Sequence, residues 1–357
     1  MFVAIRDLRF AKGRFALMGS VVTLITVLVV LLSGLTAGLG RGNTSAITDL
    51  PVDHLVFSAP GAGQKLAFTD STISPSVKEQ WAQVPGVRRA EPVTVAMTRA
   101  SVGDRTTGVA VFAVTPGSTL APQAAAGDVV LSTKAASSLQ VTAGDRIDVA
   151  GQPVTVALVS GNDEFSHAPV IWTATANAPA SSQQPGTATF LALSTDDGAD
   201  LAAADQQLGT LTLTPGKSLS AIGSYTSENG SLQLMRVLLF AISALVIGAF
   251  FTVWTVQRSG EIAILKALGA STGYLLKDAL GQALALLTVG TALGTAIAAG
   301  IGAGITALAG TAVPFELNLP TLLLPALVMV VLGLAGAAVS LRTVTTVDPL
   351  TALGSAR

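Results

Sequence analysis

The side chains with the most distinctive chemistry lie in residues 225–236, YTSENGSLQLMR, directly before a long apolar run. A phenol, a carboxylate, a thioether and a guanidinium come together there, from Tyr225, Glu228, Met235 and Arg236. This set suits an amphipathic anion such as haem, because the propionates pair with Arg and the iron accepts Tyr, Met or carboxylate ligands. We therefore predict a haem site at these four residues, with the first three as candidate iron ligands. The alternative, that Arg236 snorkels to lipid headgroups, stays open.

Other reactive constellations are missing from the sequence. The chain has no cysteine, which excludes thiolate catalysis and thiolate metal sites. Its two histidines, His54 and His167, are interpreted as surface residues in loops, and Asp163 and Glu164 near His167 make only a loose metal motif. The segment TPGKS at 214–218 lacks the first glycine of a phosphate-binding loop. We therefore predict no catalytic residues, no intrinsic cofactor and no ATP site on this chain.

The composition is that of a membrane protein. Half of the 357 residues are hydrophobic, 11% are charged, and 36 are glycine. Glycine in such a background favours closely packed membrane helices. The net charge of −1 and the lack of a basic patch give no reason to expect nucleic acid as a partner.

Four apolar segments are long enough to cross a hydrocarbon layer of about 30 Å. We expect transmembrane helices at 17–40, 231–256, 272–310 and 321–342. A secretory signal is the alternative for the first, but its apolar run is longer than a usual signal core. Small residues at Gly34 and Gly38 predict a close helix neighbour for the first span, and Gly290, Gly294, Gly300 and Gly304 predict the same for the third.

Charge sets the expected topology. Residues 1–16 carry four basic side chains and one acid, typical of an interfacial segment on the cytoplasmic face. Residues 41–230 hold 16 acids and 10 bases, against 5 and 10 elsewhere. The positive-inside rule then places residues 41–230 and the 311–320 link outside. Both termini, the tail at 343–357 and the segment 257–271 are expected in the cytoplasm.

Residues 41–230 show the pattern of a soluble mixed domain. Short β-type runs separated by turn residues recur at 54–59, 86–102, 106–114, 128–132, 145–160, 169–175, 188–194 and 209–215. Two helices are expected, at 74–84 with Ser74 as its cap and at 134–141. The fold class is therefore an α+β membrane protein: four transmembrane helices with a large mixed α/β extracytoplasmic domain between the first and the second.

The segment after the second span, RSGEIAILKALGAS, places apolar and charged residues at helical spacing. Such a short amphipathic helix suits docking of a soluble partner, although an ordinary interfacial loop is an alternative. The segment resembles the signature of the FtsX-like permease family, which includes MacB-type and haem-exporting permeases. The resemblance implies a coupling helix that touches a separate ATPase, and its candidate contact residues are Arg258, Glu261, Ile262, Lys266, Leu268 and Gly269.

The layout of one span, a large domain and three more spans is similar to this family over nearly the whole chain. The resemblance implies a homodimeric permease among membrane lipids, with two copies of a cytoplasmic ATPase that carries ATP and magnesium. A compact outer domain and no fused ATPase look most like the haem exporters. The alternatives are export of another hydrophobic compound, peptide or lipid, a signal transmitter that regulates a cell-wall hydrolase, or a structural membrane protein without an ATPase.

Overall fold

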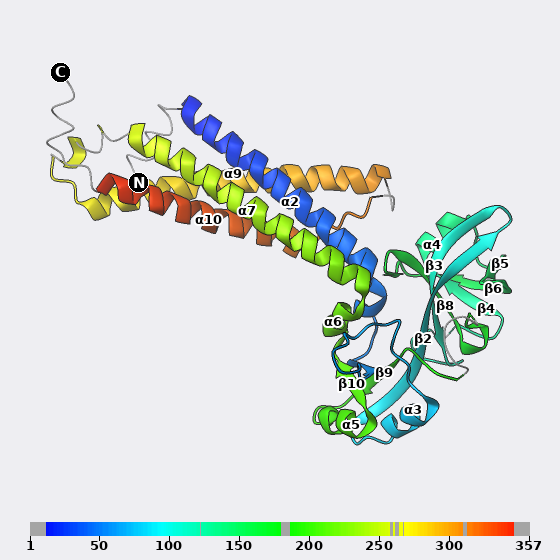
Figure 1. Ribbon diagram of the computed structural model, residues 1–357. Coiled ribbons are helices and arrows are strands. Elements are labelled where there is room, and N and C mark those ends of the chain that lie inside the picture. Colours follow the sequence, from blue (N-terminus) through cyan, green and yellow to red (C-terminus); the bar gives the residue numbers. More distant parts are fainter. Residues whose placement is uncertain are drawn as a thin grey trace. The chain divides into compact units, whose positions relative to one another are not determined.

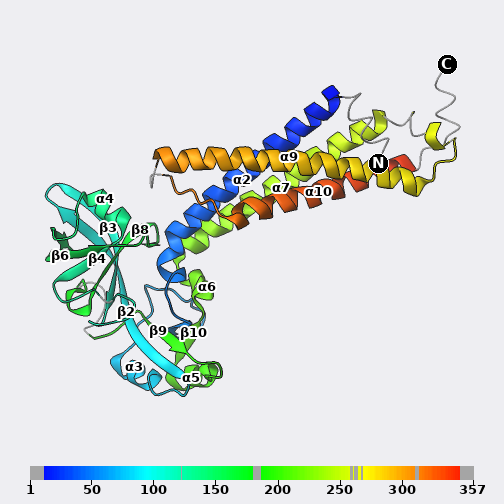
Figure 2. The same ribbon diagram turned by 180° about the vertical axis from the view of Figure 1, so that it is seen from behind.

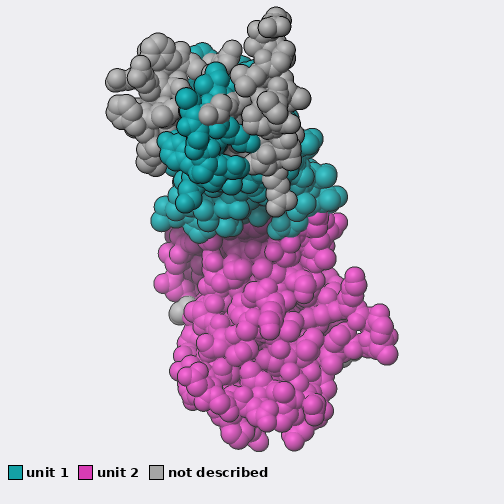
Figure 3. All heavy atoms as spheres, turned by 90° about the vertical axis from the view of Figure 1, so that its left-hand side faces the viewer, with its two compact units in different colours: residues 1–38, 231–357 teal, residues 39–230 magenta. Residues whose placement is uncertain are grey.

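A computed structural model describes residues 12–121, 123–179, 186–257, 260, 264–266, 268–309 and 313–345 (Figure 1). The predicted interfacial segment 1–16 lies mostly outside these residues. The chain forms two compact units, a helical unit of residues 1–38 and 231–357 and a sheet domain of residues 39–230 (Figure 3). Each unit is described by itself.

Four long helices supply the predicted spans: α2 (Lys12–Thr48), α7 (Gly223–Gln257), α9 (Thr272–Ala309) and α10 (Leu319–Thr345). Each is long and apolar enough to cross a membrane. Within the helical unit they run side by side (Figures 1 and 2). The predicted fold class is confirmed. Both α2 and α7 have about eight more helical residues on the side of the sheet domain than the apolar runs indicate.

Glycines bring the helices of the helical unit into close contact. A Cβ at Gly290 of α9 would lie 2.9 Å from the Val22 side chain, and one at Gly294 would lie 2.7 Å from the Thr23 carbonyl oxygen. The Thr23 hydroxyl also donates to the Gly290 carbonyl at 3.2 Å. The predicted helix neighbour of α9 at these two glycines is therefore α2. Gly300 and Gly304 meet nothing within 4 Å among the described residues of this chain, so the prediction stays a prediction for them.

A helix was predicted as the close neighbour of Gly34 and Gly38 in α2, and this prediction is wrong. A Cβ at Gly34 would lie 2.6 Å from the ring of Phe315, and one at Gly38 would collide with the carbonyl of Pro314. These residues belong to the link between α9 and α10, so a non-helical segment covers this face of α2. Small residues reveal that something approaches closely, but they do not reveal what.

The described part of the sheet domain holds ten strands: β1 (His54–Ser58), β2 (Val87–Val102), β3 (Arg105–Val114), β4 (Asp128–Leu131), β5 (Arg146–Val149), β6 (Gln152–Val159), β7 (Glu164–Phe165), β8 (Ala168–Ala174), β9 (Phe190–Thr195) and β10 (Thr210–Leu213). Their order is β10-β1-β9-β2-β3-β8-β4-β6-β5, with β7 beside β8. The long strand β2 pairs with β9 along its first half, with β3 along its second half, and with β5 at its end. The β2–β5 pairing closes six strands into a small barrel.

Short helices cover the sheet: α3 (Pro75–Trp81), α4 (Thr133–Leu139), α5 (Leu201–Leu208) and α6 (Pro215–Ser218). The predicted helix at 74–84 is confirmed, and the Ser74 hydroxyl accepts from the Val77 N–H at 3.4 Å as its cap. The predicted run 145–160 is two strands, because Ala150 and Gly151 both have positive φ and make a tight turn. The helix α5 was not predicted, since its apolar stripe is short.

Aromatic rings form the centre of the domain's largest core. Phe68 lies 5.0 Å from Phe57 and 5.2 Å from Phe165 between ring centroids, in edge-to-face contacts. Such pairs add about 0.5–1.5 kcal/mol beyond their buried area. Ala46 and Ile47, at the end of α2, are buried in the same core. This burial explains why α2 stays helical beyond its apolar run, since its last two turns pack into the domain.

Candidate functional site

Tyr225 stands in the first turn of α7. Its ring is half-buried and packs against the aromatic core of the sheet domain. A phenol held in this way already has an apolar environment around its ring. The ring is thus fixed by the core, and the role of Tyr225 as an iron ligand stays a prediction.

Glu228, one turn further along α7, is the centre of a polar cluster. Its carboxylate oxygen lies 2.7 Å from Nε2 of His167 and 2.9 Å from the amide nitrogen of Asn43. The Ser224 hydroxyl donates to the other end of the Asn43 amide at 2.6 Å, and it contacts the Ser166 hydroxyl at 2.7 Å. We call these residues, Asn43, Ser166, His167, Ser224 and Glu228, the Glu228 cluster. It joins α2, the β7–β8 turn and α7 within the sheet domain.

The proton of His167 can be placed from these distances. Nε2 cannot both accept from Asn43, 2.9 Å away, and donate to Glu228. The shorter contact is with a carboxylate, which only accepts, so Nε2–H donates to Glu228. Asn43 then gives its own N–H to the same carboxylate. Glu228 keeps 41% of its side chain exposed and His167 keeps 36%, so the carboxylate still has free lone pairs toward solvent.

The turn that carries His167 has an unusual backbone. Ser166 and His167 have φ values of 52° and 64°, a conformation in which side chains other than glycine are rare. Each such residue costs about 1–3 kcal/mol unless its surroundings hold it. Here the Ser166 N–H donates to the Asn43 carbonyl at 3.0 Å and the His167 N–H to the Gly42 carbonyl at 2.9 Å. The end of α2 thus holds the turn, and the turn presents His167 to Glu228.

The loose metal motif beside His167 serves structural contacts. Glu164 pairs with Lys134 at 2.5 Å, and its N–H donates to the Ser45 hydroxyl at 2.8 Å. Burial raises the pKa of the Asp163 carboxyl above its ordinary value of 3.8, and the nearby charge of Asp49 acts in the same direction. Among the residues that the structure describes, no three His, Cys, Asp or Glu side chains gather as metal ligands.

His54 is not in a loop as expected, because it begins strand β1. Its ring nitrogen Nδ1 lies 3.3 Å from the Thr195 hydroxyl, so this nitrogen already has a partner on the neighbouring strand β9. The TPGKS segment follows β10 directly and forms the short helix α6 with Thr214 at its N-cap, and Lys217 lies in that helix. Among the described residues, neither His54 nor the TPGKS segment forms a binding site.

Met235 and Arg236 lie further along α7. Met235 is 47% exposed and Arg236 is half-buried. A helix rises 1.5 Å per residue, so Glu228 and Met235 are separated by about 10 Å along α7. Glu228, three residues after Tyr225, lies much closer along the helix to Tyr225 than to Met235.

The coupling segment is described in part. Arg258, Glu261 and Ile262 lie outside the described residues, while Leu268 is 79% exposed and Lys266 is half-buried. The segment ends in a Schellman motif, in which Gly269 donates to the Lys266 carbonyl and Ala270 to the Leu265 carbonyl, each at 3.0 Å. Gly269 has φ +93°, so glycine is required there for the helix to end. The exposed Leu268 stands directly before this stop.

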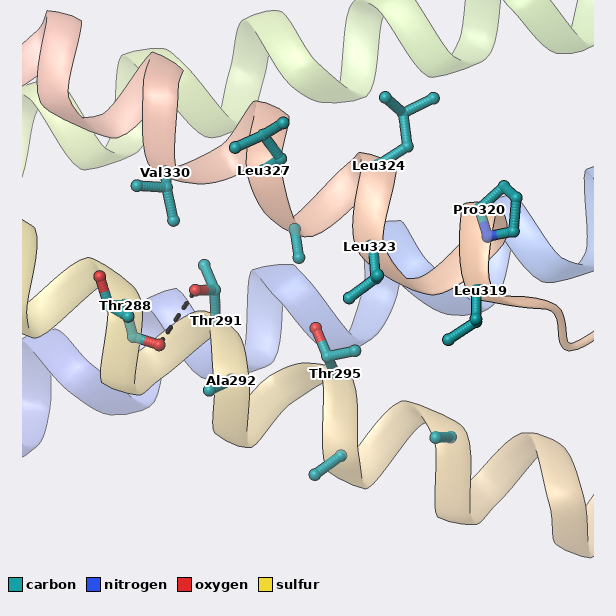
Figure 4. A pocket seen from close by; sticks show the side chains of 13 residues that line it. Thr288, Thr291, Ala292, Thr295, Leu319, Pro320, Leu323, Leu324, Leu327 and Val330 are labelled. Atoms are coloured by element: carbon teal, nitrogen blue, oxygen red, sulfur yellow. Dashed lines mark hydrogen bonds between the residues drawn. The ribbon is translucent and has the colours of Figure 1, made fainter.

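A groove of about 970 Å³ runs between α9 and α10 in the helical unit (Figure 4). Thr288, Thr291 and Thr295 line it from α9, and the remaining lining side chains are apolar: Ala292, Ala296, Ala299, Leu319, Pro320, Leu323, Leu324, Ala326, Leu327 and Val330. The first two threonines donate to carbonyls of their own helix at 2.7 and 2.6 Å. The hydroxyl of Thr295 is buried and has no hydrogen-bond partner among the described residues. The groove suits an apolar body with a polar group beside Thr295.

Sequence reasoning missed the partners of Glu228. Asn43 and His167 are 185 and 61 residues away from it, so no local pattern joins them. One signal was present, because Asn43 precedes Ala46 and Ile47 by three and four residues and so shares their helix face. A buried amide on an apolar face needs polar partners.

Four helices long and apolar enough to span a membrane, with a sheet domain between the first two in the sequence, are the layout of a multi-pass membrane protein. Residues 15–211, more than half of the chain, match the family described as MacB-like periplasmic core domain, and residues 234–349 match the FtsX-like permease C-terminal family. The chain belongs to this family of MacB- and FtsX-type permeases, and it is an ABC transporter permease. Permeases of this kind work with a cytoplasmic ATPase.

Relatives match the chain over its full length. Two of them, from Staphylococcus epidermidis and Staphylococcus haemolyticus, are each 24% identical over 99% of both chains, and their names assign them to a hemin transport system as permease protein HrtB. An uncharacterised ABC transporter permease of Mycobacterium tuberculosis is 23% identical over 99% of both chains. Among solved structures, the periplasmic region of MacB from Actinobacillus actinomycetemcomitans is 11% identical, with a TM-score of 0.34 over 50% of this chain and 92% of that one.

Proposed function

We propose that this permease exports an amphipathic anion, most simply haem, from the membrane at the expense of ATP hydrolysed by a separate cytoplasmic ATPase. The observation that carries the proposal is the full-length similarity to permeases named for hemin transport. Haem has a flat apolar body, two carboxylates and an iron, and each of these finds a suitable feature on the chain.

Three features of the chain suit the three parts of haem. The apolar groove between α9 and α10 suits the macrocycle, and its volume of about 970 Å³ is at the upper end of the usual range for small-molecule pockets. Arg236 would attract a propionate, and the exposed carboxylate of Glu228 is the best-placed iron ligand. Tyr225 and Met235 are weaker candidates, because the first packs into the core and the second lies about 10 Å from Glu228 along the helix.

The proposed complex is a homodimer with two ATPases. Both termini and the segment 257–271 face the cytoplasm, and residues 41–230 lie outside. ATP-driven closure of the ATPase pair is transmitted through the coupling segment, with Glu261, Lys266 and Leu268 as the contact residues. Leu268 supports this role because a leucine that is 79% exposed at the end of a segment offers apolar surface to a partner.

The test co-expresses the permease with its ATPase in a haem-sensitive host and measures haem tolerance, and it measures haem absorption spectra of the purified complex. Glu228→Gln keeps a side chain that accepts from Asn43 and His167 but removes the anionic ligand, so the haem band should shift while the fold persists. Arg236→Ala should weaken haem binding by about 1–3 kcal/mol, and Arg236→Lys should recover part of that loss.

Wild-type spectra and tolerance in Glu228→Gln, Arg236→Ala, Tyr225→Phe and Met235→Ala would refute the haem site. Full ATPase stimulation without any haem tolerance would favour a different hydrophobic substrate. Binding of a cell-wall hydrolase to the sheet domain, with no compound exported, would favour the signal transmitter.

A further inference from the structure

The link between α9 and α10 places an aromatic ring in a slot made by two glycines. We call its described part, Val313–Asn318, the strap. The ring of Phe315 lies between Gly34 of α2 and Gly302 of α9, and a Cβ on either glycine would collide with it. Leu317 also contacts the Gly302 position, at 3.1 Å from a Cβ built there. The two helices therefore leave a slot one ring wide, and the strap fills it.

The strap holds its place with few polar contacts. The Glu316 N–H donates to the Gly34 carbonyl at 3.1 Å, and among the described residues this is its one hydrogen bond to α2 or α9. At its other end Asn318 caps α10, accepting from the Thr321 N–H at 2.8 Å. The strap is thus capped onto α10 through Asn318, and it contacts α2 and α9 through that one hydrogen bond and the packing of Pro314, Phe315 and Leu317. The Phe315 ring is only half-buried.

The slot continues the face of α9 that lines the groove. Gly302 follows Thr295 by seven residues, which is two helical turns, so both lie on the same face. Ala299 is the last groove residue on α9 before it, and Leu319, directly after the strap, is the first on α10. The groove spans residues 288–299 and 319–330, about 16 Å along each helix, which is roughly one leaflet of the hydrocarbon layer. Phe315 stands where the groove ends.

We propose that the strap is a displaceable gate, in which the Phe315 ring closes the end of the α9–α10 groove and leaves its slot during each transport cycle, and that the vacated slot receives the flat apolar part of the substrate. The identity of the substrate in this inference rests on the proposed export function, whereas the movement of the strap does not. An aromatic ring held by van der Waals contact can be replaced by another flat apolar group, and departure of the strap breaks one hydrogen bond, that of the Glu316 N–H to the Gly34 carbonyl.

The first experiment locks the gate reversibly. The chain has no cysteine, so Gly34→Cys with Phe315→Cys introduces the sole thiol pair of the permease. A short dithiol-reactive reagent cleavable by reductant joins the strap to α2 in the assembled complex, and a gel shift confirms the bridge. The export rate should fall to that of a complex whose ATPase cannot hydrolyse ATP. It should recover when reductant cleaves the bridge. Each single-cysteine variant, treated identically, should keep its own export rate. Undiminished export by the bridged protein would overturn the proposal.

The second experiment needs neither export nor a known substrate. Phe315→Cys alone is labelled with a membrane-impermeant maleimide in the complex, with hydrolysing ATP or with ATP and a hydrolysis-blocking inhibitor. Turnover should accelerate labelling, because the slot opens in each cycle. Asp104→Cys, in an exposed turn, should label at one rate in both conditions. Equal rates for position 315 would show that the strap stays in place, even if haem is the correct substrate.

Discussion

Asn43→Ala should destabilise the sheet domain strongly for a single polar substitution. Asn43 is 1% exposed, and its amide donates to the Glu228 carboxylate at 2.9 Å and accepts from the Ser224 hydroxyl at 2.6 Å. A hydrogen bond to a charged group contributes about 1.5–3 kcal/mol and a neutral one about 0.5–1.5 kcal/mol. The sum is about 2–4 kcal/mol, while the backbone carbonyl of Asn43 still accepts from the Ser166 N–H and holds the turn.

Thermal unfolding of the intact chain measures the effect. For a domain of this size, 1 kcal/mol corresponds to about 2–4 °C in Tm, so a loss of about 3 kcal/mol lowers Tm by roughly 6–12 °C. Trp81 and Trp172 are buried in the sheet domain, and their fluorescence reports its unfolding. Ser224→Ala, which removes the neutral bond, should cost about 1 kcal/mol.

Asn43→Asp separates this explanation from simple loss of packing. Aspartate has nearly the shape of asparagine, but it replaces the donor that faces Glu228 with a second carboxylate. Like charges at this distance repel, so Asn43→Asp should lower Tm more than Asn43→Ala. An unchanged Tm in Asn43→Ala, or an aspartate variant as stable as the wild type, would refute the role assigned to the Glu228 cluster.

Further outcomes follow from other contacts. Gly302→Ala should lower the Tm of the helical unit because its methyl group meets the Phe315 ring, whereas Gly300→Ala, with open space around it, should not. Gly269→Ala should strain the end of the coupling segment by about 1–2 kcal/mol and reduce stimulation of the partner's ATPase. Asp163→Asn should stabilise the domain at neutral pH: the raised folded pKa means that the charged form disfavours folding, so in a pH series of Tm the gain should vanish toward pH 4.

Sequence alone supplied the spans because length and apolarity suffice for them, and it supplied most strands because turn residues separate them. It did not supply the helical extensions of α2 and α7, since these depend on Ala46, Ile47 and Tyr225 packing into a core built from distant strands. The sequence predicted only one member of the Glu228 cluster. Glu228 was chosen for the chemistry of its carboxylate, but the cluster is assembled from three separate segments. The neighbour of Gly34 was misjudged because a small residue records a close approach and not its source.

The pairing of β1 has a consequence for how the protein is made. Ser58 of β1 faces Thr210 of β10, roughly 150 positions later, and β9 lies nearly as far along the chain. At about 5–20 residues per second, β1 waits for some 8–30 s after its synthesis with both edges unpaired. Unpaired edges invite pairing with other chains, so the nascent domain is exposed to aggregation throughout this interval. Because α7 begins only ten residues after β10, the ribosome delivers the second membrane helix almost as soon as the sheet can close. Completion of the sheet and synthesis of the second membrane helix are thus nearly simultaneous, whereas α9 and α10 follow later.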